Sequence, residues 1–354
     1  MVHSLSQRPS SQKCAARLFM GLVAACLAAL CQPARADGTS ASLDAMKAGY
    51  QRPAKVPYPH DNPPSEAKAD LGYKLFFDPR LSGSSTMSCA SCHDPALSWG
   101  DGLPTAIGAA RLSRRSPTIL NLAWAEAMFW DGRAYTLEQQ AVGPIQAPDG
   151  MNQSMPRLVS LLNAIPGYRD AFRTAFPNEP ISATTIAKAI ATFERAIVSG
   201  EAPFDRWIKG DETAIPEAAK RGFVTFNTRG HCASCHSTWR FSDDSFHDIG
   251  LPGNDPGRGA VIAGVEPLRQ AFKTPGLRNV AERGPYMHNG SIQTLAAVIR
   301  HYDHGFTRRS SLSAEIYRLN LTDQEADDLV VFLKTLSSVD AKIAVPVLPV
   351  METR

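Results

Sequence analysis

Cysteine is scarce in this chain, and long hydrophobic runs are absent after its first three dozen residues. The 354 residues include seven cysteines, three of which lie within residues 1–36. No later apolar run approaches the roughly 20 residues that cross a bilayer as a helix, and no convincing run alternates between polar and apolar residues as a strand does. These absences exclude a body that spans the membrane and argue against a fold built on β-sheet.

The four remaining cysteines form two copies of one motif, Cys-x-x-Cys-His, at residues 89–93 and 232–236. In this motif two thiols bond to the vinyl groups of a haem, and the adjacent imidazole reaches the iron. The alternatives are a zinc half-site or a redox dithiol, but neither explains a His directly after both second cysteines. The sequence therefore predicts two covalently bound c-type haems and no disulfide. The residues concerned are Cys89, Cys92 and His93 in the first copy and Cys232, Cys235 and His236 in the second.

The start of the chain has the features of an export signal. Basic residues precede an apolar stretch at residues 18–30, which is too short to span a bilayer, and small residues at 34–36 offer a cleavage site. We predict that residues 1–36 are removed on export, which places the protein in the periplasm. The alternative is a lipoprotein signal at residues 23–26, which would leave a lipid anchor on Cys26.

The net charge of +3 belongs to the predicted signal and not to the mature protein. The signal holds four of the 37 basic residues and none of the 34 acidic ones, which leaves 33 basic against 34 acidic residues, a net charge of about −1. A surface that binds nucleic acid needs an excess of Lys and Arg. Nucleic acid is therefore not expected as a partner.

The periodicity of the mature chain is mostly helical. Apolar residues recur three and four positions apart in five segments. Three of these segments begin with a capping residue, Ser154, Ser182 or Thr322, and Glu325 completes a capping box with Thr322. Long loops rich in Pro and Gly separate the helices, as expected where haem fills the interior. The predicted helices are residues 154–162, 182–198, 216–226, 291–302 and 322–336.

Length and motif spacing predict two domains. About 318 mature residues exceed the usual size of one domain, and the two haem motifs begin 143 residues apart. We predict a mainly α fold with two cytochrome c-like domains, each enclosing one covalent c-type haem. The expected boundaries are residues 37–200 for the N-terminal domain, 201–345 for the C-terminal domain and 346–354 for a tail.

Four further motifs flank the haem sites, at residues 75–82, 129–133, 274–280 and 285–290. In combination they resemble the bacterial di-haem cytochrome c peroxidase family, which includes the MauG-like maturation enzymes. The resemblance covers about residues 54–338, nearly the whole mature chain. It implies an oxidoreductase that uses hydrogen peroxide.

The resemblance assigns a role to each haem. The N-terminal haem, with His93 as its proximal ligand, reacts with peroxide, and the C-terminal haem, with His236, stores and relays electrons. Some family members cap the first haem with a His in a loop that here reads Ile-Gly-Ala-Ala, at residues 107–110. Because Ala109 cannot ligate iron, the resemblance implies an open first haem that needs no reductive activation. The alternative is that another His swings in.

Tyr302 stands where peroxidases of this family that are fed by small redox proteins have a Met ligand. It is similar to the MauG-type Tyr ligand of the second haem. An anionic oxygen donor stabilises oxidised iron better than a thioether sulfur does, so such a haem helps to hold oxidising equivalents. His301 and His304 are competing ligands, and a Tyr on a helix is more often a core residue.

A relay and a proton-transfer group are also implied. Trp130 occupies the place of the family's Trp between the haems, and Gln140 matches a distal Gln, but Gly150 stands where the family has an acid/base Glu. Asp149 is the candidate substitute, because a neighbouring glycine gives the backbone freedom to turn it inward. The alternative is that Asp149 is a solvated loop acid and that peroxide cleavage is slow.

The family also binds a calcium ion between the haems, through an Asn side chain and backbone carbonyls. Arg115 stands at the Asn position, and the carbonyls would come from Arg283 and Pro285. An arginine side chain offers only donors. The usual calcium site is therefore doubtful, and calcium is possible only through other oxygens or water.

Three functions remain open from the sequence. The first is peroxide-dependent oxidation of a protein partner, as in MauG-like enzymes, which Tyr302 and Ala109 favour. The second is removal of hydrogen peroxide with electrons from a small periplasmic redox protein, and the third is electron transfer alone with both irons capped. For the first, the route to the surface is also open, because Gly230 stands where a MauG-like enzyme has a relay Trp. Trp239 is the candidate replacement.

Overall fold

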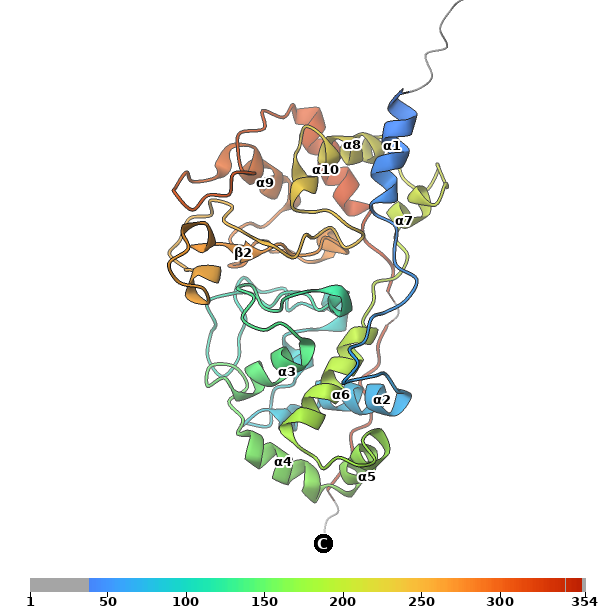
Figure 1. Cartoon of the computed structure of the whole chain (residues 1–354), viewed down its shortest axis with the longest axis vertical. Helices are drawn as coiled ribbons and strands as arrows, with labels where there is room; N and C mark the ends of the chain where they lie inside the picture. The colour runs from blue at the N-terminus through green and yellow to red at the C-terminus, as the bar shows by residue number, and fades with distance from the viewer. Residues whose placement is uncertain (1–37, 341, 352–354) are drawn as a thin grey trace, which may run out of the picture. The chain divides into compact units, whose positions relative to one another are not determined.

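A computed structural model of the protein describes residues 38–340 and 342–351. The predicted export signal and the alternative lipid anchor at Cys26 lie outside the described residues. Leu43–Arg354 form one compact unit, and Figure 1 shows its helices and loops. Within the described ranges, no helix is long and apolar enough to cross a membrane.

The described residues are mainly helical, which confirms the predicted fold class. Strands are reduced there to one antiparallel pair, β1 (Phe246–His247) and β2 (Phe272–Lys273). The α-helices are α1 (Gly38–Ala48), α2 (Glu66–Phe77), α3 (Leu137–Gln146), α4 (Met155–Ala164), α5 (Pro166–Ala175), α6 (Ala183–Ala196), α7 (Pro203–Ile208), α8 (Glu217–Asn227), α9 (Leu295–Arg300) and α10 (Asp323–Lys334). Short 3₁₀ helices are η1 (Pro79–Leu81), η2 (Cys89–Ser91), η3 (Pro95–Leu97), η4 (Leu122–Trp124), η5 (Cys232–Ser234), η6 (Arg258–Ala260), η7 (Glu266–Leu268) and η8 (Val280–Glu282), and η9 (His301–Gly305) is a π-helical turn.

A close crossing of α2 and α6 organises the first hydrophobic core. The side chain of Ser65 caps α2 by accepting a hydrogen bond from the backbone N–H of Lys68. A Cβ on Gly72 would lie 2.0 Å from the carbonyl oxygen of Ala189, so the two helices can approach this closely only at a glycine. The buried side chains of this core come from residues 71–197.

The second core repeats this arrangement with aromatic filling. Helix α8 crosses α10 at Gly222, where a Cβ would lie 2.1 Å from the carbonyl oxygen of Asp328. The rings of Phe204, Phe223 and Phe332 form a triangle with centroids 5.6–5.7 Å apart, within the range of favourable aromatic contacts. A glycine-mediated helix crossing therefore accompanies each of the two haem motifs.

Each end of the described chain contacts the half of the molecule that lies farther away in sequence. Tyr50, which follows α1, packs in the second core with its ring 4.8 Å from that of Phe241. In the first half, the guanidinium of Arg80 donates to the carbonyl oxygen of Pro349 at 2.9 Å. The domain limits at residues 37–200 and 201–345 therefore stay a prediction, because chain segments from each side contact the opposite core.

The predicted helices correspond to α4, α6, α8 and α10 within a few residues. The capping box of Thr322 with Glu325 and the cap at Ser182 are confirmed, whereas the side chain of Ser154 makes no capping hydrogen bond. The fifth prediction, 291–302, begins later, as α9, and continues into the wider turn of η9. Tyr302, the predicted ligand of the second haem, lies in that turn.

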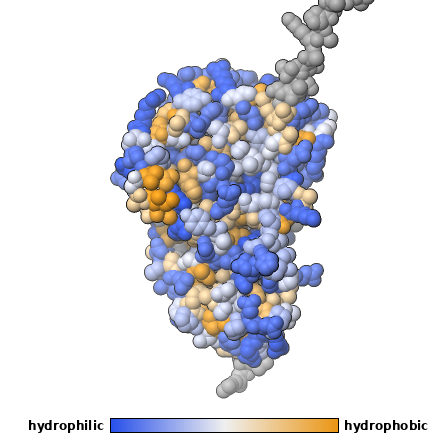
Figure 2. Space-filling model, viewed as in Figure 1, coloured by the Kyte–Doolittle hydropathy of each residue, from blue (hydrophilic) through white to orange (hydrophobic). Residues whose placement is uncertain are grey.

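The surface mixes polar and apolar residues. Figure 2 shows a compact apolar patch among hydrophilic residues on the face in view. Among the exposed hydrophobic residues of the described chain, three lie close together in sequence between η6 and η7: Val261, Ile262 and Val265. None of the three lines the large cavity in which the predicted site residues meet.

Candidate active site

One large cavity brings together every residue predicted to bind haem or to act in catalysis. Its volume is about 1210 Å³, above the 300–1,000 Å³ that is usual for a single small ligand. Side chains from the first and second halves of the chain line it together. The predicted residues on its wall are Cys89, Cys92, His93, Trp130, Gln140, Asp149, Cys232, Cys235, His236 and Tyr302.

The first haem motif presents its imidazole to this cavity. The 3₁₀ turn η2 begins after Ser88, whose backbone N–H donates to the side-chain oxygen of Ser91 at 3.0 Å. Nδ1 of His93 lies 3.2 Å from the carbonyl oxygen of Trp99 and donates to it, which leaves Nε2 as the free ring nitrogen. Burial lowers the pKa of His93, and a neutral imidazole is the form that binds iron.

The second motif has the same geometry. Nδ1 of His236 donates to the carbonyl oxygen of Phe241 at 2.8 Å, and burial lowers the pKa of this imidazole as well. The two cysteines beside each His are partly buried on the cavity wall. In both copies a neutral imidazole with a fixed ring orientation and two thiols face one space, so the residues present fit two c-type haems.

Tyr302 faces the cavity, whereas the competing ligands are bonded elsewhere. Nε2 of His301 donates to the carbonyl oxygen of Ile249 at 2.9 Å, and His304 pairs with Asp303 at 2.8 Å. Neither histidine lines the cavity, while Tyr302 does. Burial raises the pKa of the Tyr302 phenol. Within η9 the phenol of Tyr302, and neither imidazole, therefore lies on the cavity wall.

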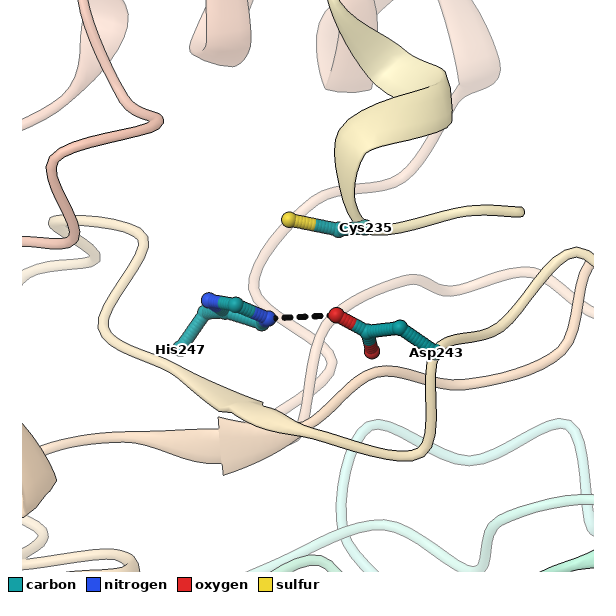
Figure 3. A group of neighbouring side chains, drawn as sticks. All are labelled: Cys235, Asp243 and His247. Carbon is teal, nitrogen blue, oxygen red and sulfur yellow. Dashed lines mark hydrogen bonds and ion pairs between the residues drawn. The ribbon is translucent and has the colours of Figure 1, made fainter.

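A third histidine, His247, lies beside the second motif and is also committed. Figure 3 shows its ring facing the carboxylate of Asp243, with Nε2 donating to an oxygen at 2.7 Å. The bond to Asp243 raises the pKa of His247 to about 10. Together with Cys235 these side chains form a cluster whose spacing suits a metal ion. The thiol of Cys235 is the one that would bond to haem, so it is not available to a metal ion. We therefore describe His247 and Asp243 as an ion pair beside the second haem motif.

Trp130 is held at the junction of the two halves. Its indole Nε1–H donates to the carbonyl oxygen of Arg115 at 3.0 Å, and its own carbonyl accepts from the backbone N–H of Lys273 in β2 at 2.8 Å. Its ring lies 6.4 Å from that of His288 in an edge-on arrangement. The residue predicted as a relay therefore contacts segments that follow both haem motifs.

The loop that carries the capping His in some relatives is docked here. The backbone N–H of Ala109 donates to the carbonyl oxygen of Gly150 at 2.6 Å, and that of Ala110 to Asp149 at 3.2 Å. A Cβ on Gly150 would lie 2.6 Å from the carbonyl oxygen of Pro144. This backbone has no room for the family's glutamate at residue 150, and the docked loop covers the same segment.

Gln140 and Asp149 differ in exposure. Gln140 projects from α3 and is partly buried on the cavity wall, whereas Asp149 lies on the wall but is exposed. Both predicted roles stay predictions. The exposure of Asp149 favours the interpretation as a solvated loop acid at the rim.

The sequence matches two family descriptions that together span this cavity. Residues 66–213 match di-haem cytochrome c peroxidase, and residues 219–337 match cytochrome c. The chain is 53% identical over 321 residues to the methylamine utilization protein MauG of Methylorubrum extorquens, covering 89% of this chain and 91% of that protein. The chain belongs to the di-haem cytochrome c peroxidase family.

This di-haem peroxidase also resembles other members. It is 35% identical to cytochrome c551 peroxidase of Pseudomonas aeruginosa, over 84% of this chain and 86% of that protein. The solved structure of a MauG-like protein associated with microbial copper homeostasis matches with a TM-score of 0.74 at 34% identity, covering 81% of this chain and 95% of that one. The predicted family, the oxidoreductase class and the two c-type haems are thus confirmed, while the roles of single residues stay predictions.

The described residues of this di-haem peroxidase do not fit the family's usual calcium site. Arg115, only 9% exposed, donates from its guanidinium to the carbonyl oxygen of Arg283 at 2.9 Å. That carbonyl is one of the two that calcium would need. Burial lowers the pKa of both guanidinium groups, but a positive side chain here still repels a metal ion. The guanidinium of Arg115 thus occupies the place where the family resemblance implied a calcium ion, as the sequence had led us to doubt that site.

Glu194 is a cavity residue that sequence reasoning missed. It lies on α6, is 4% exposed and has one carboxyl oxygen without a hydrogen-bond partner among the described residues. Burial raises its pKa to about 8. The available signal was an acidic residue four positions after Ile190, on the apolar face of a predicted helix, where a charge is unexpected.

Proposed function

We propose that this di-haem peroxidase uses hydrogen peroxide to oxidise a protein partner in the periplasm. The observation that carries the proposal is the position of Tyr302. It faces the cavity beside the second haem motif, whereas His301 and His304 are bonded to other groups. The 53% identity to MauG supports it. Export through the predicted signal at residues 1–36, with a lipid anchor at Cys26 as the alternative, is part of the same proposal.

When bound, the two haems supply the redox chemistry, in which hydrogen peroxide takes up two electrons and two protons and becomes water. The protein's part at the first motif is to hold the site open and oriented. His93 is fixed by its bond to Trp99, and the docked loop keeps Ala109 off the cavity wall. Gln140, on the cavity wall, would orient the peroxide by hydrogen bonding.

Proton transfer at this site has two candidate groups. Asp149 lies at the exposed rim, and Glu194 is buried on the cavity wall with a pKa raised to about 8 by burial. A carboxyl group that keeps its proton at neutral pH can donate it to a departing oxygen. Glu194 therefore joins Asp149 as a candidate for the role that the missing glutamate at residue 150 leaves open.

At the second motif, His236 and Tyr302 are the residues that would hold the iron of the second haem. Such an oxygen donor would stabilise oxidised iron, so that oxidising equivalents persist long enough to reach a slow-binding protein. Trp130, fixed by Arg115 and Lys273, would couple the two haems. Reaction with peroxide at the first haem and storage of oxidising equivalents at the second would suit a substrate that is too large for the cavity.

The alternative function is removal of peroxide with electrons from a small redox protein. The 35% identity to cytochrome c551 peroxidase supports it. The two functions differ in the fate of added partners. We expect peroxide, added with periplasmic proteins from the source cell, to cause a mass change in a partner protein and only slow oxidation of reduced small cytochromes. Fast steady-state oxidation of a cytochrome with no modified partner would favour peroxide removal.

The ligation is tested by spectroscopy of the purified ferric protein. We expect one high-spin and one low-spin haem, and Tyr302→Phe should change the spin state of the second haem while both haems stay covalently bound. His304→Gln is the matched control, because His304 lies on the same turn but pairs with Asp303. Two low-spin haems in the wild type would contradict both enzymatic functions and support a pure electron carrier.

A further inference from the structure

The protein partner of the proposed function is too large for a cavity of about 1210 Å³, so an aromatic side chain that joins the cavity to the surface would shorten the path of an electron from the partner. The position at which MauG-like enzymes have a relay Trp is Gly230, and a Cβ there would lie 2.8 Å from the carbonyl oxygen of Thr225. This backbone therefore has no room for a side chain at residue 230. If the exit exists, another element must provide it.

Trp239, the replacement suggested by sequence, is poorly suited. It is 7% exposed and does not line the cavity. The guanidinium groups of Arg52 and Arg278 lie 5.3 and 5.7 Å from its ring centroid. Two positive charges at this distance oppose the loss of an electron from the indole, because they raise the energy of the resulting cation.

Of the aromatic residues in the described ranges, two both line the cavity and are well exposed: Tyr135 at 56% and Tyr317 at 44%. Tyr317 lies beside the second haem motif. Its ring is 5.3 Å from that of His231, the residue directly before Cys232. It thus joins the surface to the haem that would store the oxidising equivalents.

The loop of Tyr317 is fixed to the turn that precedes the second motif. Nε2 of His231 donates to the carboxylate of Glu315 at 2.6 Å, and the guanidinium of Arg229 donates to the carbonyl oxygen of Asn320 at 2.5 Å. Both contacts flank the backbone of Gly230. The ring of Tyr317 therefore lies against His231, the residue directly after Gly230.

The charges around the two tyrosines are opposite. The phenol oxygen of Tyr135 accepts a hydrogen bond from the guanidinium of Arg258 at 2.9 Å, and that cation opposes loss of an electron from the phenol. Tyr317 instead has the carboxylate of Glu315 two residues away, paired to the imidazole against which its ring lies. A negative group beside a residue that is losing an electron lowers the energy of the oxidised state.

We propose that Tyr317 is the relay residue through which this enzyme oxidises its protein partner, an inference that rests on the proposed function. In each round Tyr317 gives one electron toward the second haem and its phenolic proton to water. A side chain of the partner then returns an electron and a proton to Tyr317. Two rounds supply the two electrons that reduce one hydrogen peroxide, with two protons, to two water molecules.

The test uses the intact holoenzyme, hydrogen peroxide and a nitrone spin trap, with the labelled residue located by peptide mass spectrometry. We expect the adduct at Tyr317 in the wild type, a loss of at least tenfold in Tyr317→Phe, and no change in Tyr135→Phe, the matched control. The haem absorption change on adding peroxide should be the same within twofold in all three proteins. Glu315→Gln should lower the adduct yield several-fold and keep its position.

The outcomes separate this inference from the proposed function. If the haem absorption changes with peroxide but the adduct lies at Tyr135 or Trp239, or keeps its yield in Tyr317→Phe, the relay is not Tyr317 and the proposed function stands. If the wild-type haem absorption does not respond to peroxide at all, the proposed function is wrong, and the relay falls with it.

Discussion

At the scale of single residues, Glu194 shows most clearly how burial sets chemistry in this protein. Its carboxyl is on the cavity wall, and one of its oxygens has no partner among the described residues. Burial raises its pKa from the ordinary value of 4.5 to about 8. The folded state therefore binds a proton between these pH values that the unfolded chain releases. Such a group stabilises the fold most below pH 4.5 and loses that contribution as pH rises to 8.

This residue gives a prediction about stability. Between about pH 5 and 8, the free energy of unfolding of the wild type should contain a slope of roughly −1.4 kcal/mol per pH unit from Glu194 alone. Glu194→Gln should remove that slope, because an amide does not titrate. Denaturant unfolding at pH 5, 6.5 and 8 measures it, with the exposed Glu201→Gln as control for losing one carboxyl. Equal pH dependence in wild type and Glu194→Gln would disprove the assignment.

The residues expected to bond to haem could be predicted from the sequence, whereas residues whose role depends on tertiary packing could not. The spacing of Cys89, Cys92 and His93 is dictated by the porphyrin itself, so the motif predicts its chemistry without any fold. The lack of a hydrogen-bond partner for one Glu194 oxygen depends on which helices pack around it. The hydrogen bond from the Arg115 guanidinium to the Arg283 carbonyl oxygen joins segments 168 residues apart. No local pattern carries that kind of information.

At the scale of elements, the loop at residues 107–110 is docked on the segment that carries Asp149 and Gly150, and its Gly108 lines the cavity. Two backbone hydrogen bonds hold it against Asp149 and Gly150, and a Cβ on Gly108 would lie 2.4 Å from the carbonyl oxygen of Asp149. At about 1 kcal/mol for each hydrogen bond, docking is favoured by about 2 kcal/mol, a factor of about 30. Ala109 does not line the cavity in this position.

We therefore expect that restoring the family's histidine in this loop does not restore its capping role. Ala109→His should react with peroxide in the fully oxidised state within about twofold of the wild-type rate, because the docked backbone points residue 109 away from the cavity. Stopped-flow absorbance measures the rate, and Ala110→His controls for an added imidazole nearby. A variant that reacts only after one-electron reduction would mean that the loop undocks.

Some elements could be predicted and others could not, for physical reasons. Helices α6, α8 and α10 have regular apolar stripes on one face, and their periodicity gave them within a few residues. Helix α3 contains Pro144, and α7 has only six residues, so their patterns are too short or irregular. The α-helical spacing read for residues 291–302 gives way to the π-helical turn η9, yet Tyr302 lines the cavity with Leu295, Val298 and Ile299, which stand seven, four and three positions before it.

At the scale of the whole molecule, two arginines join the segments that follow the two haem motifs. The guanidinium of Arg114 pairs with Asp131 and with Asp255, both at 2.7 Å. The backbone N–H of Arg115 donates to the carbonyl oxygen of His288 at 2.9 Å, in addition to the side-chain bond to Arg283. The indole N–H of Trp130 donates a hydrogen bond to the carbonyl oxygen of Arg115. The positive charge that joins these segments around Trp130 is therefore supplied by the side chains of Arg114 and Arg115.

From this arrangement we expect the wild type to need no calcium. Chelation by EGTA should leave its thermal midpoint and its haem spectra unchanged, because the guanidinium of Arg115 already binds the Arg283 carbonyl. Arg115→Asn removes that cation and offers a side-chain oxygen in its place. Without calcium this variant should lose about 1–3 kcal/mol of stability, since a buried carbonyl loses its donor. The indole of Trp130, which is bonded to the backbone of residue 115, should then be held less rigidly.

Calcium should then rescue Arg115→Asn, because the freed carbonyl and the new amide oxygen are ligands that calcium accepts. At a concentration 100 times the dissociation constant, binding to the folded state alone adds about 2.7 kcal/mol, enough to recover most of the loss. Arg115→Leu is the matched control, since it loses the cation but offers no oxygen, and calcium should leave its thermal midpoint unchanged. Destabilisation of the wild type by EGTA would show instead that a metal ion and Arg115 act together, and would overturn the view that the chain supplies this charge alone.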